Sequence, residues 1–299
     1  MSTTVSQIEK HAANMRRNIV KMLGLAGSGH PAGALGLADI FAALYFEILR
    51  FNPRRPDDPE RDLLVLSAGH VCPVLYAALA ERGLIDEREL WTLRQFGSRL
   101  QGHPERERLP WLETTSGPLG CGISQAAGMA YTLLNWDNEK GKEQPEQKSH
   151  FLPGAMRKTV GLSHVPHVYV ITGDGELDEG NNWEALMFAA KNNLHNLTLI
   201  IDRNNIQIDG TTEYVMPLEP LDDKLKSFGL NVIQINGNNV ESFIDACQRA
   251  RATTDRPSAI IAHTIPGRGV SFMENNHEWH GRAPTADEAK KALAELGVL

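Results

Sequence analysis

Two short β-branched runs, joined by a Gly-Asp-Gly turn and an amphipathic segment, constrain the fold of this chain more than any other feature. The first run covers residues 168–172, the turn lies at 173–175, the amphipathic segment continues to Leu194, and the second run covers 197–206. Apolar runs of this length around a helical segment are typical of a βαβ unit with parallel, buried strands. We therefore expect the rest of the chain to pack around such a unit.

Polar residues follow both predicted strands at their carboxyl ends, where ligands collect in an open parallel sheet. Asp174 follows the first strand and Asn204 follows the second. Carboxylate and amide oxygens suit Mg²⁺ or Ca²⁺ rather than zinc. Gly173 and Gly175 let the backbone approach a bulky group, and a diphosphate bridged through the metal ion fits that description. The alternative is that Gly-Asp-Gly is ordinary turn chemistry.

Repeated alternation of strands and helices predicts an α/β fold with a doubly wound parallel sheet and helices on both faces. We expect the 299 residues to form a single domain, with a glycine-rich loop at 27–36 and a polar surface insertion at 137–165. The other predicted strands are 61–66, 231–235 and 258–265, and the predicted helices are 8–25, 37–49, 71–82, 86–96, 123–136, 221–228, 240–253 and 286–296.

Composition excludes several classes of protein. The net charge is −7 and Lys and Arg are scattered along the chain, which argues against nucleic-acid binding. Cys72, Cys121 and Cys247 are odd in number and far apart, so neither a disulfide framework nor a zinc site is expected. We found no apolar run of membrane-spanning length and no signal-peptide pattern, and we expect a cytoplasmic protein without membrane contact.

Five of the eleven histidines lie beside glycine or near the end of a predicted strand: His30, His70, His103, His277 and His280. Any one of them alone could be structural. Together they indicate that imidazoles from separate loops converge on one pocket, where they could orient hydroxyls, contact phosphate or move protons. No pair has the close helical spacing of a zinc motif.

Six motifs, in this order along the chain, resemble those of transketolase, a thiamine diphosphate enzyme. They are Ser-Gly-His-Pro at 28–31, Leu-Ser-Ala-Gly-His at 66–70, Gly-His-Pro at 102–104, Gly-Pro-Leu-Gly-Cys-Gly at 117–122, Gly-Asp-Gly-Glu-Leu-Asp-Glu-Gly at 173–180 and His-Glu-Trp-His-Gly at 277–281. The resemblance extends over nearly the whole chain, from about residue 8 to about residue 284. It implies the thiamine diphosphate-binding fold of the diphosphate-binding domain.

The resemblance also implies a cofactor and its ligands. Thiamine diphosphate would be carried by Mg²⁺ or Ca²⁺, held by Asp174, Asn204 and the backbone carbonyl of Ile206, with Gly173 and Gly175 beside the diphosphate. The backbone of Gly117 would face the aminopyrimidine, and Leu119 would lie along the cofactor.

Catalytic roles follow from the same resemblance. His30, His70, His103 and His277 would line the substrate channel and contact the diphosphate or the sugar oxygens. Glu179 would reach across a dimer interface towards the catalytic glutamate of a neighbouring pyrimidine-binding domain. The alternative for Glu179 is a helix-start carboxylate that the helix dipole favours.

This chain departs from the family pattern in two residues and in length. Ala32 replaces a usual glycine, and Cys121 replaces a usual glutamine in the cofactor loop, where it could alternatively be a small buried hydrophobe. The pyrimidine-binding domain and its glutamate are missing. The chain therefore resembles the N-terminal subunit of a split transketolase, forming an α₂β₂ assembly with a separate C-terminal subunit.

The implied reaction moves a two-carbon ketol unit from a ketose, or ketose phosphate, to an aldose or its phosphate. Two alternatives remain. One is the α subunit of a 2-oxo acid dehydrogenase, which also has a Gly-Asp-Gly to Asn motif on a separate chain. The other is a non-catalytic, cofactor-binding scaffold.

Overall fold

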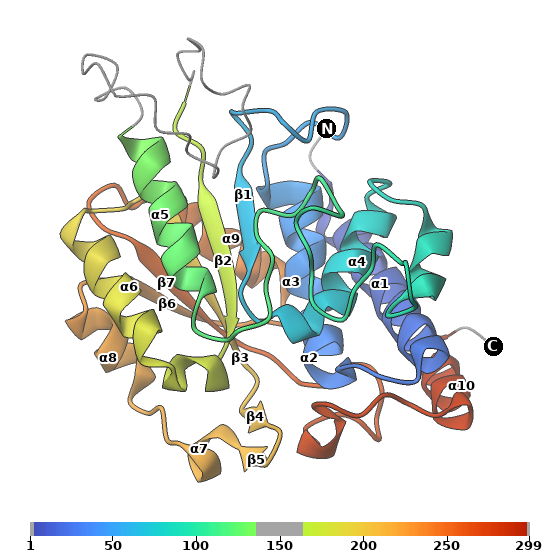
Figure 1. Ribbon diagram of the computed structural model, residues 1–299. Coiled ribbons are helices and arrows are strands. Elements are labelled where there is room, and N and C mark those ends of the chain that lie inside the picture. Colours follow the sequence, from blue (N-terminus) through green and yellow to red (C-terminus); the bar gives the residue numbers. More distant parts are fainter. Residues whose placement is uncertain (1–2, 136–163, 298–299) are drawn as a thin grey trace.

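The computed structural model describes residues 3–135 and 164–297, and its centre is a five-stranded parallel sheet (Figure 1). The strand order is β1-β2-β3-β7-β6, and every neighbouring pair is parallel. The strands are β1 (Leu63–Leu66), β2 (Val168–Gly173), β3 (Leu197–Arg203), β6 (Asn231–Asn236) and β7 (Ser258–His263). The predicted doubly wound α/β fold is confirmed.

Helices cover both faces of this sheet because successive side chains of a strand point to opposite sides. In β2, Tyr169 and Ile171 enter one hydrophobic core, whereas Val168 and Val170 enter the other. The first core lies under α1 (Val5–Ala26), α2 (Pro31–Gly36), α3 (Ala38–Ala43), α4 (Cys72–Glu81) and α9 (Val240–Ala252), and the second under α5 (Gly122–Leu134), α6 (Gly180–Lys191) and α8 (Leu221–Ser227).

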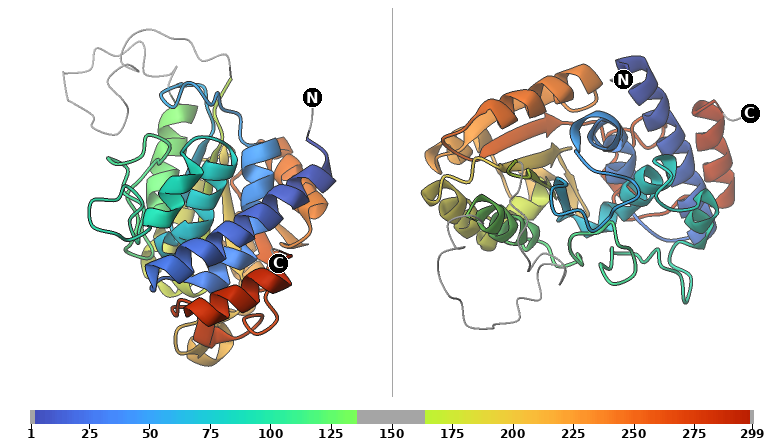
Figure 2. Two further views of the ribbon diagram at one scale, coloured as in Figure 1. Left: turned by 90° about the vertical axis from the view of Figure 1, so that its right-hand side faces the viewer. Right: turned by 90° about the horizontal axis from the view of Figure 1, so that it is seen from above.

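The first helix follows the predicted amphipathic pattern. Its predicted apolar stripe, Ile8, Ala12, Met15, Ile19, Met22 and Leu23, is fully buried. Thr4 begins the helix with a capping box, in which its side chain and that of Gln7 each accept from the other's backbone N–H. The C-terminal α10 (Ala286–Glu295) packs beside α1 (Figure 2).

Several predicted elements were wrong in detail. The predicted loop at 27–36 contains α2, whose glycines serve close packing: a Cβ on Gly36 would lie 3.0 Å from the carbonyl oxygen of Ile265. The predicted helix at 86–96 is only the 3₁₀ helix η3 (Glu87–Thr92), because Leu93, with ψ 129°, and Arg94, with φ 61°, leave the helical conformation. The predicted strand at 197–206 ends at Arg203.

Several elements were not predicted. The predicted helix at 37–49 is α3 followed by a turn of π-helix, η1 (Leu44–Ile48), whose geometry was not predicted. 3₁₀ turns occur at η2 (Gly69–Val71), η5 (Gly175–Asp178) and η6 (His277–Trp279). After β3 the chain forms a small excursion with the antiparallel strands β4 (Ile206–Gln207) and β5 (Gly210–Thr211) and the short helix α7 (Thr212–Val215), which projects beyond the carboxyl edge of the sheet (Figure 1).

The predicted surface insertion at 137–165 lies almost wholly outside the described residues. Among the residues that are described, no helix has the length and apolar character needed to cross a bilayer.

Candidate active site

A cavity of about 200 Å³ opens at the carboxyl edge of the sheet, between the ends of β2 and β3. The predicted site residues that line it are His70, Leu119, Gly173, Asp174, Gly175, Asn204 and Ile206. They come from several loops but meet here because parallel strands end at one edge. The two candidate side-chain metal ligands, Asp174 and Asn204, therefore share one cavity.

Asp174 is a buried carboxylate held by three donors. Its Oδ1 accepts from the backbone N–H of Gly175 at 2.8 Å, and its Oδ2 accepts from the N–H of Asn205 at 2.7 Å and from Arg203 Nη1 at 3.0 Å. Burial nevertheless raises the pKa of Asp174 above its usual value, against the effect of these donors. A cation in the cavity would offset the cost of burying this charge.

Asn204 is oriented by contacts on both ends of its amide. Its Nδ2 donates to Asp202 Oδ2 at 2.7 Å, and its Oδ1 accepts from the N–H of Ile206 at 3.0 Å. Asp202 is fully enclosed, and burial raises its pKa to about 7. Sequence reasoning missed this carboxylate, although it lies two residues before Asn204.

The donor set fits a hard cation. No cluster of three or more His, Cys, Asp or Glu side chains within residues 3–135 and 164–297 could hold a metal ion. One carboxylate, one amide oxygen and one backbone carbonyl from Asp174, Asn204 and Ile206 form a different kind of set, made only of oxygens. Such ligands suit Mg²⁺ or Ca²⁺, which complete their coordination with phosphate and water oxygens.

Three imidazoles form a cluster beside this cavity. Ring centroids lie 4.9 Å apart for His30 and His70, 5.2 Å for His70 and His280, and 5.9 Å for His30 and His280. Burial, followed by the neighbouring imidazoles, lowers the pKa of His70 to about 3, and burial also lowers the pKa of His30 to about 4. Both rings are therefore neutral near pH 7.

The cluster contains His280, whereas the family resemblance points to His277. His277 is exposed on η6, and His280 lines the cavity. Trp279 explains the difference, because it is buried against Phe272, with ring centroids 5.5 Å apart, and fixes the orientation of the turn. Of the two histidines in this motif, His280 is therefore the one that the fold brings to the cavity.

His103 faces the predicted cofactor loop. A Cβ built on Gly117 would lie 3.7 Å from the imidazole of His103, and one on Gly69 would lie 3.1 Å from the nitrogen of Gly117. The Gly117 loop is therefore pressed between the His70 turn and His103. Burial, assisted by the charge of Arg94, lowers the pKa of His103.

Glu176 joins three of the motifs, a role that sequence reasoning did not assign to it. This buried carboxylate accepts hydrogen bonds from the hydroxyl of Ser67, the N–H of Gly120 and the hydroxyl of Thr172. It thus connects the end of β1, the cofactor loop and the end of β2. The available signal was a glutamate directly after Gly-Asp-Gly, at the end of a strand predicted to be buried.

Glu179 and Cys121 are both exposed at the N-termini of helices. Glu179 precedes α6 without capping it through its side chain, and its Cβ is 2.7 Å from the position of a Cβ on Gly120. Since Gly120 also has φ 83°, only glycine fits there. The alternative interpretation of Cys121 as a buried hydrophobe was wrong, because this side chain is exposed.

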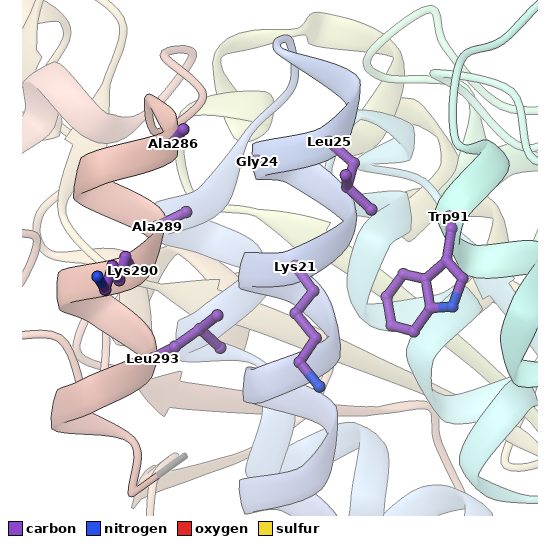
Figure 3. Close-up of a pocket in the computed structure, with 8 residues that line it drawn as sticks. All are labelled: Lys21, Gly24, Leu25, Trp91, Ala286, Ala289, Lys290 and Leu293. Carbon is purple, nitrogen blue, oxygen red and sulfur yellow. The ribbon is translucent and has the colours of Figure 1, made fainter. Parts of the chain in front are cut away.

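A larger cavity, about 460 Å³, lies elsewhere, between α1, η3 and α10 (Figure 3). Its lining is Lys21, Gly24, Leu25, Trp91, Ala286, Ala289, Lys290 and Leu293. None of these residues belongs to the candidate site. Volume alone therefore does not identify the functional cavity.

The chain belongs to the family described as transketolase, thiamine diphosphate binding domain, whose model matches residues 8–299. It is 38% identical over 289 residues to the 6-deoxy-6-sulfo-D-fructose transketolase subunit of a Clostridium species, covering 96% of this chain and 95% of that protein. It is 36% identical to an apulose-4-phosphate transketolase subunit from Actinobacillus succinogenes, covering 97% of this chain and 96% of that protein. The chain is thus an N-terminal transketolase subunit.

Solved structures agree. Transketolase from Leishmania mexicana aligns with a TM-score of 0.85 at 33% identity, over 97% of this chain and 41% of that one. Transketolase from Campylobacter jejuni aligns with a TM-score of 0.85 at 32% identity, over 99% of this chain and 43% of that one. These findings confirm the predicted family and fold, and they favour transketolase over the α subunit of a 2-oxo acid dehydrogenase.

Proposed function

We propose that the chain, with a separate pyrimidine-domain subunit, forms a thiamine diphosphate- and Mg²⁺-dependent transketolase that transfers a two-carbon ketol unit from a ketose phosphate to an aldose phosphate. The observation that carries this proposal is the shared cavity, where the oxygen ligands of Asp174, Asn204 and Ile206 adjoin a cluster of neutral imidazoles. A cytoplasmic location is part of the proposal, and the three free cysteines support it.

The cofactor, when bound, supplies the carbanion chemistry for breaking and forming the C–C bond. This chain supplies position and proton transfer. Asp174, Asn204 and Ile206 hold the metal ion, and the Gly117 loop with Leu119 contacts the cofactor. Because the segment at Gly117 is packed against Gly69 and His103, it is rigid before the cofactor arrives.

Neutral imidazoles can accept the proton of the sugar hydroxyl that becomes a carbonyl as the C–C bond of the ketose breaks. They can then donate that proton to the carbonyl oxygen of the aldose, which becomes a hydroxyl as the new C–C bond forms. His30 is suited to this step, since its Nδ1 is buried and has no hydrogen-bond partner within the described residues. A buried polar atom without a partner is costly, so a substrate or cofactor atom that pairs with Nδ1 is favoured. We assign His280 and His70 to hold the sugar and the diphosphate beside it.

An exposed apolar surface next to the site supports a partner chain. Leu119 before α5, Tyr131 on α5, and Met187 and Phe188 on α6 are between 39% and 54% exposed, and the rings of Tyr131 and Phe188 lie 5.6 Å apart. Glu179 is exposed at the start of the same helix. A second apolar group, Ile208, Tyr214 and Met216, is exposed on the excursion after β3.

Relatives named as subunits support this proposal. The chain covers 95% and 96% of two proteins whose names call them transketolase subunits, whereas it spans 42% of the human transketolase to which it is 34% identical. We propose an α₂β₂ assembly that buries more than roughly 2,000 Å² at each obligate interface. Sedimentation of the mixed subunits as this heterotetramer would support it, and separate monomers would contradict it.

Two-carbon transfer is the direct test. A ketose phosphate and an aldose phosphate are supplied with thiamine diphosphate and Mg²⁺, first to this chain and then to its mixture with the candidate partner. We expect activity only in the mixture. Activity of the chain alone would contradict the need for a partner glutamate. A mixture that binds the cofactor but is inactive with phosphorylated and non-phosphorylated sugars would favour the scaffold alternative.

A further inference from the structure

Arg203 holds three carboxylates from three segments together at the edge of the proposed metal site. Its Nη1 lies 3.0 Å from Oδ2 of Asp174, and its Nη2 lies 2.5 Å from Glu213 and 3.0 Å from Glu219. Arg203 and Asp174 side chains are 3% and 1% exposed, whereas Glu213 and Glu219 are 40% and 56% exposed. The guanidinium therefore connects a buried ligand to a partly exposed excursion.

Strand geometry explains how Arg203 reaches both sides. It is the last residue of β3, and alternation directs its side chain away from that of Asp202, which holds the amide of Asn204. The excursion carries Glu213 on α7, and the chain then leads back towards β3 at Glu219. Both glutamates therefore accept from the guanidinium of Arg203. A planar fork with several N–H donors can make these contacts together, which a lysine ammonium on a flexible stem does less well.

The contact determines how Asp174 presents its oxygens. Oδ2 already accepts from Arg203 and from the N–H of Asn205, whereas Oδ1 accepts only from Gly175. Oδ1 is therefore the oxygen with more capacity left for a cation. Arg203 also places a positive charge beside the buried carboxylate of Asp174, which stabilises the charged form of this side chain.

We propose that Arg203 is a positioning residue for the metal ligand Asp174, and that it couples the excursion at 204–219 to Mg²⁺-dependent cofactor binding. This inference rests on the proposed function. It assigns to the excursion a role in binding, because movement of Glu213 and Glu219 would be transmitted through the guanidinium to Asp174.

The test measures the Mg²⁺ dissociation constant at saturating thiamine diphosphate, by titration calorimetry on the complex with the partner chain. Thermal unfolding without cofactor is measured in parallel. We expect Arg203→Lys to weaken Mg²⁺ binding by about 10- to 100-fold, the range for loss of a charge-assisted hydrogen bond. The double variant Glu213→Gln/Glu219→Gln changes only partly exposed side chains, and we expect it to fold normally and to weaken Mg²⁺ binding several-fold.

Arg251→Lys is the matched control. Arg251 pairs with the buried Asp62 and donates to the hydroxyl of Tyr169 at 2.7 Å. Asp62 directly precedes β1, so this ion pair lies at the amino edge of the sheet, opposite the candidate site. We expect this variant to lower thermal stability without changing the Mg²⁺ dissociation constant. The inference would be overturned if Arg203→Lys and the double glutamate variant both fold and both bind Mg²⁺ like the wild type. If the wild-type complex itself shows no Mg²⁺-dependent binding of the cofactor, the proposed function is overturned as well.

Discussion

The carboxylate of Glu176 accepts a hydrogen bond from the backbone N–H of Gly120 at 2.8 Å, although the two residues are 56 positions apart. The same carboxylate accepts from Thr172 at 2.6 Å and from Ser67, whose hydroxyl oxygen in turn accepts from the N–H of Gly122 at 3.0 Å. The proposed cofactor loop is therefore fixed to the ends of β1 and β2 by one buried side chain. Such a fully bonded network makes a rigid site.

Replacement of Glu176 by Gln tests this connection. Glutamine keeps the shape but turns one acceptor oxygen into a donor that faces other donors, so we expect the free energy of unfolding to fall by about 2–3 kcal/mol. Cofactor affinity should fall as well, because the Gly120 loop loses its anchor. Urea unfolding and cofactor titration measure the two effects. Glu184→Gln, at an exposed position of α6, is the control, and equal effects of both variants would contradict the assigned role.

Replacement of glycine by alanine should change the stability of the chain in opposite directions at two positions of α5. A Cβ on Gly122 would lie 2.3 Å from the side chain of Ser67 and 2.8 Å from its Cα, whereas a Cβ on Gly128 would meet nothing within 4 Å. We expect Gly122→Ala to destabilise the chain by about 1–3 kcal/mol through overpacking. Gly128→Ala should stabilise it by about 0.5–1 kcal/mol, because alanine is the better helix former. Similar unfolding midpoints for the two variants would show that the loop does not pack as described.

Neutralising Asp174 should abolish Mg²⁺-dependent binding of thiamine diphosphate. Asp174→Asn preserves the shape of the side chain but removes the charge that a hard cation requires. Fluorescence titration of the cofactor, with and without Mg²⁺, measures the effect on the complex. Asp178→Asn, at an exposed carboxylate on η5, is expected to bind as the wild type does. Unchanged Mg²⁺-dependent affinity of Asp174→Asn would refute the metal assignment.

The two histidines of the motif at 277–281 provide a matched pair. His280→Asn removes an imidazole that lines the cavity beside His30 and His70, and we expect at least about a 100-fold loss of kcat/KM, in the range for general acid–base groups. His277→Asn changes an exposed side chain three residues away and should leave turnover within about twofold. Steady-state kinetics with both subunits compares them, and a larger effect at His277 would favour the role that the family resemblance implies for it.

Stability should fall as pH is lowered below neutral. The pKa values of His30 and His70 are lowered to about 4 and about 3 in the folded chain, from about 6.5 when unfolded. As pH falls through about 6.5, the unfolded state gains protons that the folded state does not bind, so the free energy of unfolding decreases down to about pH 4 for His30 and about pH 3 for His70. Urea unfolding between about pH 7.5 and about pH 5 measures the slope.

The variants His30→Asn and His70→Asn separate this effect from other titrations. Each should reduce the pH slope, whereas the buried His167, whose pKa is also lowered to about 3, contributes equally to all the proteins compared. A slope that stays the same in both variants would mean that these imidazoles are not buried as neutral groups.

The periodicity of apolar residues and the positions of turn residues were sufficient to predict the parallel sheet, the long first helix and the positions of Asp174 and Asn204 at strand ends. These features depend on local preferences: β-branched runs form strands, a period of about 3.6 residues forms helices, and glycines mark the turn after β2. The six ordered motifs, from 28–31 to 277–281, were sufficient to identify the family. Boundaries within glycine-rich segments were not predicted, because the glycines around α2 serve close packing rather than a loop.

Tertiary structure alone decided which side chains of these motifs meet. The local sequence does not distinguish His277 from His280 as a site residue. Burial of Trp279 against Phe272 orients the turn so that His280 faces the cavity. Glu176 and Arg203 acquire their roles through partners contributed by other segments, Gly120 in one case and Glu213 and Glu219 in the other. The amino-acid sequence thus determined the elements and the chemistry available at the sheet edge. Packing between distant segments determined which groups share the cavity, because a side chain's neighbours depend on the whole fold.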